Sequence, residues 1–412
     1  MSSQPHDLPQ RRRISRLVIL CITILLATAT AIASAAQTVP DKGTEAAFEF
    51  ATWNIEQFGN TGGGPSNEAR QLTNAATIIR ESQIDLWAVQ EIADESAFND
   101  LVNEVGAGYE GRLAPTPSSL RVGYIFKSDI VSALSVQEIL TQFDSDFAGR
   151  PPFLLRARIS LPDTAMTVTF ITIHMKAFDD QSSYERRVRA SGYLKNHIDF
   201  SSLFDDPVVI LGDYNDLLEG SIRGGLPSPY ANFVSDEAGY LTVTRTFHDD
   251  NTNTWCGNDN SCRSGSPIDH IVITNEVFPV FKSGSQAPLN ELLSDPAYVF
   301  TTSDHLPVMG RLARPSPVGI DVPAVPRRGS QETALYPNPV HSGGQLTLRA
   351  DDPVALLIEV FDVLGRRRYA RLSLQSGGTH ILPTDELGSG VYFVRTTSSS
   401  GTSHVLKLIV TR

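Results

Sequence analysis

Short apolar stretches and longer amphipathic segments alternate from Phe48 to about Leu312. The stretches at 48–54, 86–89, 168–173, 208–211 and 268–273 predict strands, most of them buried. Two helices are expected between them. The first, which Ser66 would cap, carries the apolar face Ala69, Leu72, Ala76 and Ile79, and the second carries the inner stripe Tyr184, Val188, Ser191, Leu194 and Ile198. This pattern predicts a mixed α/β domain with a substantial core.

The pattern changes after residue 313. Residues 314–333 are poor in apolar side chains and hold Pro315, Pro317, Pro323 and Pro326, which predicts an extended linker. Beyond it, short alternating stretches at 345–349, 356–362, 369–374, 391–396 and 405–410 are separated by turn residues, without helical periodicity. We expect a small all-β sandwich over 334–412.

The first 35 residues have the composition of a secretory signal peptide. Four arginines between residues 11 and 16 precede an apolar run, 17–27, that is too short for a comfortable membrane span. Ala33-Ser34-Ala35 then offers a cleavage site, and an uncleaved anchor is the alternative. The expected organisation is a signal peptide at 1–35, an α/β domain at 36–313, a linker at 314–333 and the β-sandwich at 334–412.

Composition limits the class of protein. The chain has 412 residues, of which 41% are hydrophobic and 19% charged, and a formal net charge of −12. These values are typical of a globular protein and argue against binding nucleic acid through a broadly basic surface. Loss of residues 1–35 removes four Arg and one Asp, which leaves the remainder near −15. A local basic site remains compatible with this charge.

Three cysteines are present, and Cys21 lies in the apolar run of the leader. Export would place Cys256 and Cys262 in an oxidising compartment, where the short Gly-Asn-Asp-Asn-Ser loop between them predicts a disulfide. A two-thiolate metal site is the alternative, but no His or Cys pair stands nearby at the spacing of a zinc site.

Polar side chains gather at the ends of the apolar strands, where α/β domains usually carry their sites. Six clusters share this position: Trp53 to Glu56, Gln90-Glu91, Thr172 to Lys176, Gly212 to Asp216, Pro267 to His270, and Thr302 to Pro307. Any one of them is more typical of a turn or cap. Together they supply two Asn side chains, at least two imidazoles and, among their carboxylates, the four of Glu91, Asp213, Asp269 and Asp304.

This set of side chains indicates one kind of chemistry. Carboxylate and amide oxygens suit magnesium, calcium or manganese better than zinc. Imidazoles beside such a cation can transfer protons near neutral pH or stabilise charge on a phosphoryl oxygen. The combination predicts metal-assisted hydrolysis of a phosphate ester.

The ordered motifs Trp-Asn-Ile, Gln-Glu, His-x-Lys, Gly-Asp-Tyr-Asn, Ile-Asp-His-Ile and Ser-Asp-His-Leu-Pro resemble the endonuclease/exonuclease/phosphatase superfamily. This is the deoxyribonuclease I-like group of magnesium-dependent phosphodiesterases. The resemblance covers roughly residues 48–312. It implies a four-layered α/β sandwich, in which two packed sheets are flanked by helices.

The resemblance also implies a metal site that holds Mg²⁺, with Mn²⁺ or Ca²⁺ as alternatives. Glu91 would be the principal ligand, Asn54 would help to hold the ion, and Asp304 would lie on the metal side. Glu56 stands where the family often has a second acidic residue near the metal, although a solvated strand-end charge explains it equally well.

Five further residues would carry the reaction. Asp213 would orient or deprotonate the attacking water, and Asn215 would bind a phosphate oxygen. His305 would act on the scissile phosphate while Asp269 fixes its tautomer. His174 would bind or protonate a non-bridging or leaving oxygen. Two nearby residues, Lys176 and His270, are explained equally well as strand-end polar groups.

Departures from the motifs of one known branch of the family argue against an inositol polyphosphate as the substrate. Leu211 stands where inositol polyphosphate phosphatases carry a Trp ahead of Gly-Asp, and residues 267–270 depart from their Trp-x-Asp-Arg block. Arg186, Arg187, Arg189 and Lys195 are a candidate phosphate-contacting patch, or a solvated helix face.

We expect a secreted metal-dependent phosphodiesterase, a nuclease with DNA or RNA as its partner. A sphingomyelinase-like phospholipid phosphodiesterase and a catalytically silent surface-binding protein remain as alternatives. The sphingomyelinase branch usually has an apolar loop for membrane contact, and no clear hairpin of that type is present.

The C-terminal region resembles the type IX secretion sorting domain. The residues responsible are Leu335 to Val340, Val360 to Gly365, Leu387 to Val394 and Lys407-Leu408. The resemblance implies contact with outer-membrane secretion machinery and export through the periplasm and outer membrane. The protein would be secreted or held at the cell surface, monomeric and without a membrane span after processing. A substrate-binding β-sandwich is the alternative.

Overall fold

The computed structural model describes residues 38–204, 206–314, 334–350, 356–363, 366–373, 378–385, 387–398 and 403–412. The expected signal peptide and residues 315–333 of the expected linker lie outside these ranges. Across the described parts of the chain, no helix is both long and apolar enough to cross a membrane.

Two six-stranded mixed sheets form the centre of the first domain. In the first, the strand order is β11-β12-β1-β2-β4-β3, and in the second it is β5-β6-β7-β8-β10-β9. The first sheet contains β1 (Ala47–Phe58), β2 (Leu86–Ile92), β3 (Tyr109–Leu113), β4 (Arg121–Lys127), β11 (Ala287–Pro288) and β12 (Val308–Ala313). The second contains β5 (Val131–Glu138), β6 (Phe153–Leu161), β7 (Thr164–His174), β8 (Val208–Asp213), β9 (Tyr240–Thr242) and β10 (Asp269–Thr274).

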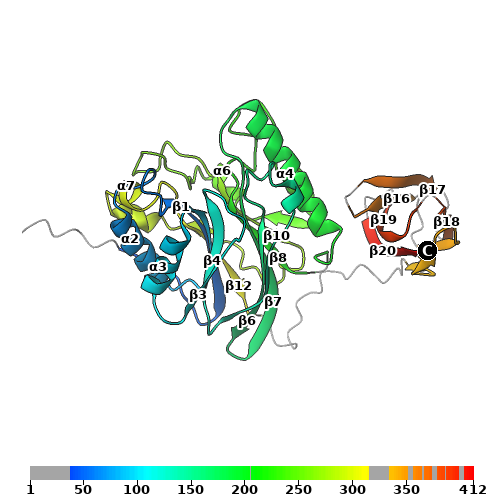
Figure 1. The fold of residues 1–412 in the computed structure, drawn as a ribbon, viewed down its shortest axis with the longest axis horizontal. Helices are drawn as coiled ribbons and strands as arrows, with labels where there is room; N and C mark the ends of the chain where they lie inside the picture. Colours follow the sequence, from blue (N-terminus) through cyan, green and yellow to red (C-terminus); the bar gives the residue numbers. More distant parts are fainter. Residues whose placement is uncertain are drawn as a thin grey trace, which may run out of the picture.

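Helices cover the outer faces of both sheets. Figure 1 shows α2 (Glu68–Glu81) and α3 (Glu95–Val105) on one flank and α4 (Gln181–Asp199) on the other. Shorter helical segments are η2 (Thr141–Phe143), α5 (Ala231–Val234), α6 (Thr246–Asp249), η3 (Asn290–Ser294) and α7 (Tyr298–Thr301). The arrangement is a four-layered α/β sandwich, which confirms the expected fold class.

Three apolar clusters separate the four layers. Between the sheets, Phe48 and Phe50 of β1 pack with Phe170 of β7 and with strand residues of both sheets. A second cluster joins the other face of the first sheet to α2 and α3, and a third joins the second sheet to α4. Because strand side chains alternate between faces, β1 contributes Phe50 to the central core and Trp53 to the outer one.

Both predicted helices are present, but their buried faces differ from the predicted apolar stripes. In α2, Ala69 is exposed and Gln71 is buried. In α4, Val188 is 41% exposed, whereas Arg187 is fully buried. The reason is the same in both helices: each buried polar side chain has fixed partners inside the protein, described below, so polarity does not mark the solvent face.

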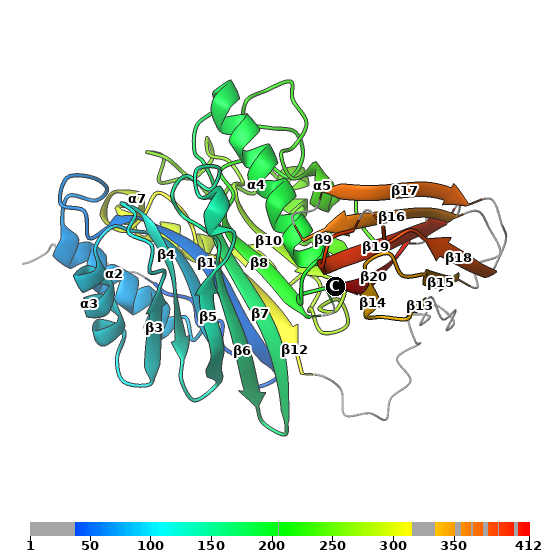
Figure 2. The ribbon, with the colours of Figure 1, turned by 45° about the vertical axis from the view of Figure 1, so that its right-hand side comes forward.

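Each sheet has one parallel pair of strands at its centre. β1 pairs with β2, and β7 pairs with β8, with α2 and α4 as the respective crossovers. The antiparallel neighbour β10 begins opposite the end of β8, and β12 begins opposite Thr52, midway along β1 (Figure 2). The ends of the parallel strands and the starts of their antiparallel neighbours therefore meet at one edge of the sandwich.

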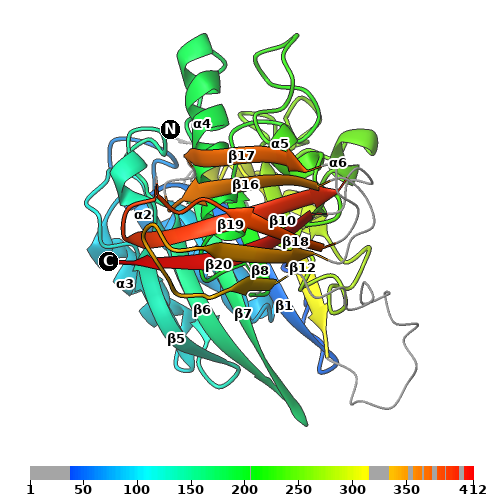
Figure 3. The same cartoon turned by 90° about the vertical axis from the view of Figure 1, so that its right-hand side faces the viewer.

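The second domain is a small β-sandwich, as expected. A three-stranded sheet, β13-β15-β18, faces a five-stranded sheet, β14-β20-β19-β16-β17, most of which is visible in Figure 3. One apolar cluster joins the two sheets, with Leu346, Leu348 and Leu382 from the first and Ile358, Val394 and Leu408 from the second. The strands are β13 (Ala334–Tyr336), β14 (Val340–His341), β15 (Leu346–Ala350), β16 (Leu356–Asp362), β17 (Arg367–Ser373), β18 (Gly378–Leu382), β19 (Gly390–Ser398) and β20 (Ser403–Thr411).

Gly212 provides a test of how closely β7 and β8 must approach. Its φ is +153°, and a Cβ there would lie 2.0 Å from the carbonyl oxygen of Ile173. Gly212→Ala should therefore lower the free energy of unfolding by about 2–4 kcal/mol in urea denaturation. Gly192→Ala is the matched control, because nothing lies within 4 Å of a Cβ at that helical position. It should stabilise by about 0.5–1 kcal/mol, and equal effects at both positions would contradict the close-approach argument.

Candidate active site

All eight predicted site residues lie at the shared edge of the two sheets. Asn54 and Glu91 come from the ends of β1 and β2, and His174 and Asp213 end β7 and β8. Asp269 begins β10 and pairs in register with Asp213. The remaining residues, Asn215, Asp304 and His305, lie in the segments just after β8 and just before β12.

Glu91 reaches the site because β2 is irregular there. The pairing of β2 with β4 shifts between Val89 and Ile92, and Glu91 has a φ of +63°. A bulge of this kind turns a side chain away from the regular alternation, and bulges are common beside active sites. The Glu91 carboxylate accepts a hydrogen bond from Asn54 Nδ2 (3.1 Å) and another from the backbone N–H of Gln57 (2.9 Å).

The Asp213 carboxylate is the point on which the other groups converge. Its Oδ2 accepts from Asn54 Nδ2 and Asn215 Nδ2, each at 3.0 Å. The Nε2 atoms of His174 and His305 lie 3.5 Å and 4.0 Å from the same oxygen. Burial raises the pKa of Asp213 to about 7, although the nearby His305 favours the ionised form. This carboxyl therefore gains and loses a proton near neutral pH.

His305 is paired with a second buried carboxylate. Its Nδ1 lies 2.8 Å from Asp269 Oδ2, and Asp269 is itself fully buried. Burial alone would lower the pKa of His305, but the carboxylates of Asp269, Asp304 and Asp213 outweigh it and raise the pKa well above its usual value. Asp269 thereby fixes the ring so that Nε2 faces the site.

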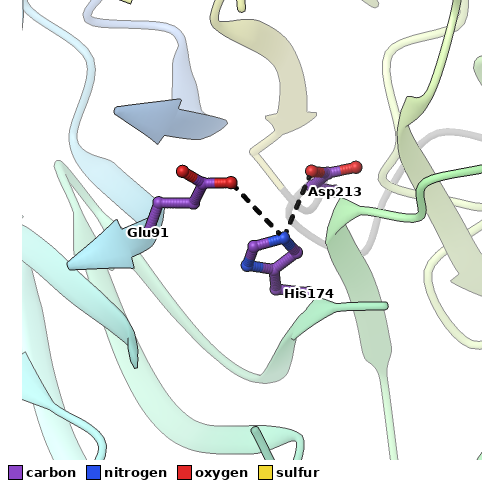
Figure 4. A group of neighbouring side chains, drawn as sticks. All are labelled: Glu91, His174 and Asp213. Carbon is purple, nitrogen blue, oxygen red and sulfur yellow. Dashed lines mark ion pairs between the residues drawn. The ribbon is translucent and has the colours of Figure 1, made fainter. Parts of the chain in front are cut away.

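His174 has the opposite protonation state. Burial, and then the positive charge of Arg150, hold its pKa well below the usual value, so the ring is neutral near pH 7. Its Nε2 lies between the carboxylates of Glu91 (3.7 Å) and Asp213 (3.5 Å), as Figure 4 shows. Among the described residues, Nδ1 has no hydrogen-bond partner. The single proton is therefore best placed on Nε2, where it can be donated.

The acidic side of the site fits a hard divalent cation. Burial, and then the charge of Asp304, raise the pKa of Glu56 to about 7, and Glu91 adds to the shift. Glu56 Oε2 accepts from the Asp304 backbone N–H (3.1 Å). Close carboxylates with raised pKa values are relieved by a cation, and oxygen donors suit Mg²⁺. Glu91 and Asp213, with His174 Nε2 between them, also place two carboxylate oxygens within 4.8 Å of each other.

Asn54 has an orientation that bears on its role. Its amide nitrogen faces Glu91 and Asp213, while its Oδ1 accepts from the Glu56 backbone N–H (3.0 Å). In this orientation Asn54 positions the carboxylates of Glu91 and Asp213, and its amide oxygen is engaged by the backbone. Its predicted part in holding the metal stays a prediction.

Several positioning residues escaped prediction from the sequence. Gln71 Nε2, from α2, donates to the carbonyls of Ile55, Glu56 and Thr302 and so ties the end of β1 to the segment before β12. Thr254 Oγ1 donates to Asp269 Oδ2 (2.7 Å). A buried polar residue on the inner face of a helix was the available signal for Gln71, whereas Thr254 stands in a loop without a distinguishing pattern.

Two groups considered from the sequence lie outside the site. His270 contacts Thr244 and the carbonyl of Asp216, and burial lowers its pKa to about 4, so it is a neutral core residue. The four side chains of the candidate phosphate-contacting patch on α4 each have a partner within the protein. Its members are engaged elsewhere: Arg187 with Asp216, Arg189 with Asp146, Lys195 with Asp199 and Asp236, and Arg186 with the carbonyl of Ser145.

The predicted disulfide between Cys256 and Cys262 is present and borders the site. The Cys256 backbone N–H donates to the Asp304 carbonyl (2.7 Å), and the neighbouring Trp255 donates from Nε1 to Asp304 Oδ2 (2.8 Å). Trp255 is 36% exposed. The bridged loop therefore holds Asp304 in place and presents an aromatic ring at the rim.

A two-sheet sandwich with carboxylates and imidazoles at one strand edge defines a class of hydrolases that act on phosphate esters. The chain belongs to the Endonuclease/Exonuclease/phosphatase family, which matches residues 51–305. No curated protein matches the chain. The Secretion system C-terminal sorting domain matches residues 334–411. The protein is therefore directed to export and is either secreted or located at the cell surface.

Solved structures with similar folds include several from this family. An endonuclease/exonuclease/phosphatase from Bacteroides vulgatus is 16% identical, with 65% of this chain and 99% of that chain covered and a TM-score of 0.48. The human Nocturnin catalytic domain with bound sulfate anion is 15% identical over 65% and 95% of the two chains, at a TM-score of 0.46. A mannosyl-6-phosphatase from Bacteroides thetaiotaomicron is 14% identical, with 65% of this chain and 99% of that chain covered and a TM-score of 0.44.

The raised pKa values of Asp213 and Glu56 predict how pH affects a metal-induced rise in Tm. Both pKa values are about 7 in the metal-free fold, against ordinary values of 3.8 and 4.5. Between these values the folded chain binds more protons than the unfolded chain, so these groups lower its stability as pH rises. A cation needs the ionised carboxylates, so Mg²⁺ should raise Tm more at about pH 8 than at about pH 5.5.

Differential scanning calorimetry with Mg²⁺ or with chelator measures this dependence. Glu91→Gln should abolish most of the metal-induced rise in Tm. Glu185→Gln, at an exposed position on α4, should leave it unchanged. A rise of equal size at both pH values would contradict the assignment of the metal to these carboxylates.

The disulfide makes a separate prediction about stability. Replacing both Cys256 and Cys262 with Ser opens a short loop, which should cost about 2 kcal/mol of unfolding free energy. It should also lower activity, because the loop holds Asp304. Intact mass before and after reduction reports the bridge, and urea denaturation reports the stability. Free thiols in the native protein, or unchanged stability in the double variant, would contradict the prediction.

Proposed function

We propose that this protein is a divalent-cation-dependent phosphodiesterase that cleaves DNA or RNA outside the cell. The observation that carries the proposal is the convergence of two imidazoles in opposite protonation states on the Asp213 carboxylate. The site combines a base, Asp213, with a cationic group, His305, and a neutral hydrogen-bond donor, His174. Both imidazoles lie within about 4 Å of Asp213 Oδ2. A base, a cation and a hydrogen-bond donor are each suited to one task in phosphodiester hydrolysis.

The proposed reaction assigns one task to each side chain. Asp213 accepts the proton of the attacking water, for which a pKa of about 7 is well matched. His305 Nε2–H, held by Asp269, stabilises negative charge on a non-bridging phosphoryl oxygen. His174 donates from Nε2 to the leaving or a second non-bridging oxygen. Asn215, whose Nδ2 donates to Asp213 Oδ2 and to the Met175 carbonyl, positions the Asp213 carboxylate.

The metal side of the proposed reaction consists of Glu91, Glu56 and Asp304, with Asn54 aligning Glu91. A bound Mg²⁺ would supply Lewis-acid stabilisation of the charge that develops on the phosphate and its leaving oxygen. The chain has a formal net charge of −12, which repels a polyanion. The positive charge of the bound ion would offset this repulsion at the site.

Two observations support nucleic acid over phospholipid as the substrate. The large exposed apolar side chains of the described residues are scattered along the chain, for example Leu134, Leu241 and Phe300, and do not come from one apolar hairpin. Trp255, at the rim of the site, offers an aromatic face to a base or sugar. Export through the sorting domain places the enzyme where extracellular nucleic acid is available.

A substrate panel tests this proposal. Duplex DNA, single-stranded DNA, RNA, sphingomyelin and a sugar phosphomonoester are each incubated with the protein, with Mg²⁺ or with chelator. We expect cleavage of at least one nucleic acid, lost with chelator. Cleavage of sphingomyelin or the monoester alone would replace the proposed substrate, and activity that persists in chelator would contradict the metal assignment.

Single substitutions test the roles of individual residues. Asp213→Ala and His305→Ala should each lower kcat by several orders of magnitude, and Asp269→Asn by about 10²–10⁴-fold through loss of the ring orientation. His270→Gln serves as the control histidine, because it lies outside the site. Circular dichroism confirms folding of each variant. Losses below about tenfold in Asp213→Ala would show that another base acts.

A further inference from the structure

The loop that joins β7 to α4 carries an exposed aromatic ring on a strained backbone. Phe178 is 69% exposed and has a φ of +80°. For a bulky residue other than glycine, this conformation costs free energy and persists only where the surroundings impose it. Lys176 Nζ lies 4.2 Å from the centroid of the ring. The pair therefore forms a cationic aromatic surface that contributes little to the core.

Buried charges hold this loop in place. Arg187 is fully buried and pairs with Asp216 through Nη2 (2.8 Å). Its Nη1 donates to the carbonyls of Lys176 (2.6 Å) and Phe178 (2.8 Å). The buried Arg187–Asp216 ion pair therefore fixes the backbone of the loop at Lys176 and at Phe178.

The same loop is fixed at its other end to the catalytic centre. Arg150 donates to the carbonyls of His174 (3.2 Å) and Met175 (2.9 Å), and Asn215 also donates to Met175 (3.1 Å). Phe178 is four positions after His174 in the sequence, so their Cα atoms lie at most about 14 Å apart. The loop is therefore held at a set position beside the catalytic centre.

Lys176 differs from three neighbouring cations on α4. Arg187, Arg189 and Lys195 are each paired with a carboxylate. Within the described part of the chain, Lys176 has no carboxylate partner, and its hydrogen bond is to the carbonyl of the adjacent Ala177 (3.3 Å). An unpaired ammonium beside a phosphodiesterase site is suited to a second phosphate of the substrate.

We propose that Lys176 and Phe178 form a platform for single-stranded nucleic acid, on which Phe178 stacks on a base and Lys176 contacts a flanking phosphate. The inference rests on the proposed nuclease function and deepens it by naming the substrate class. A base must be unstacked from its neighbours to lie on an exposed ring, which favours single strands over duplexes. Both residues determine specificity and take no part in bond cleavage.

Steady-state kinetics of the full chain test the platform with two substrates. One is a single-stranded DNA oligonucleotide, and the other is an abasic strand of the same length, which keeps the phosphates and lacks the bases. Phe178→Gly should raise KM for the normal strand about 5–150-fold, with kcat little changed. It should leave KM for the abasic strand unaltered. Lys176→Ala should raise KM for both strands and reduce the salt dependence of binding.

Thermal unfolding separates this role from a structural one. Glycine accepts a positive φ without strain, so Phe178→Gly should keep or raise Tm while nucleotide affinity falls. Leu134→Ala and Lys282→Ala, at exposed positions, are the controls and should change neither KM nor Tm appreciably. A lower Tm with unchanged KM for the normal strand would assign Phe178 a structural role and overturn the platform.

The outcomes also separate this inference from the proposed function. If the wild-type protein cleaves no nucleic acid, both are overturned. If it cleaves duplex DNA but no single strand, the platform alone is overturned. If it cleaves them and Phe178→Gly has the wild-type KM, the platform alone is overturned. Equal increases in KM for the normal and abasic strands would likewise exclude base stacking.

Discussion

The buried carboxylate of Asp213 is the constraint on which the rest of the site depends. It is 1% exposed, and an ionised group in such surroundings is costly unless its hydrogen bonds are satisfied. Two amides donate to one of its oxygens, and two imidazoles approach the same atom. These partners come from β1, β7 and the segments after β8 and before β12. The carboxylate is therefore tolerated only when both sheets meet at the correct edge.

Polar contacts between the sheets help to set that alignment. Tyr124 of β4 is fully buried, donates to the Phe153 carbonyl and accepts from the Thr172 backbone N–H, each at 2.8 Å. Gln90, beside Glu91, donates to Thr172 Oγ1 (3.0 Å). Apolar packing alone tolerates sliding of one sheet over the other, whereas these bonds are satisfied at one register. The acidic end of β2 is thus held opposite the His174 end of β7.

Much of this organisation could be predicted from the sequence, because strand ends carry both the fold and the chemistry. The apolar runs at 86–89 and 208–211 are followed at once by Glu91 and Asp213, and the structure brings these residues to one edge. The strands between residues 109 and 161 were not predicted. Several of them carry mixed polarity, as in β3 and β5, so periodicity is weak there.

The roles of side chains whose partners lie far away in the sequence could not be predicted. Arg187 reads as a solvent-facing helix residue until Asp216 is placed beside it. His270 stands next to Asp269 in the sequence, yet successive strand residues point to opposite faces, which takes it into the core. Gln71 and Thr254 hold the site through contacts with segments more than ten residues away.

A difference in charge between His305 and His174 around Asp213 is central to the proposed reaction. Nuclear magnetic resonance of the imidazole nitrogens, recorded on the metal-free protein across a pH titration, measures this most directly. The pKa of His305 should lie well above its usual value, and His174 should remain neutral well below that value. If both rings titrate together near the ordinary histidine pKa, about 6.5, the proposed division of roles is wrong.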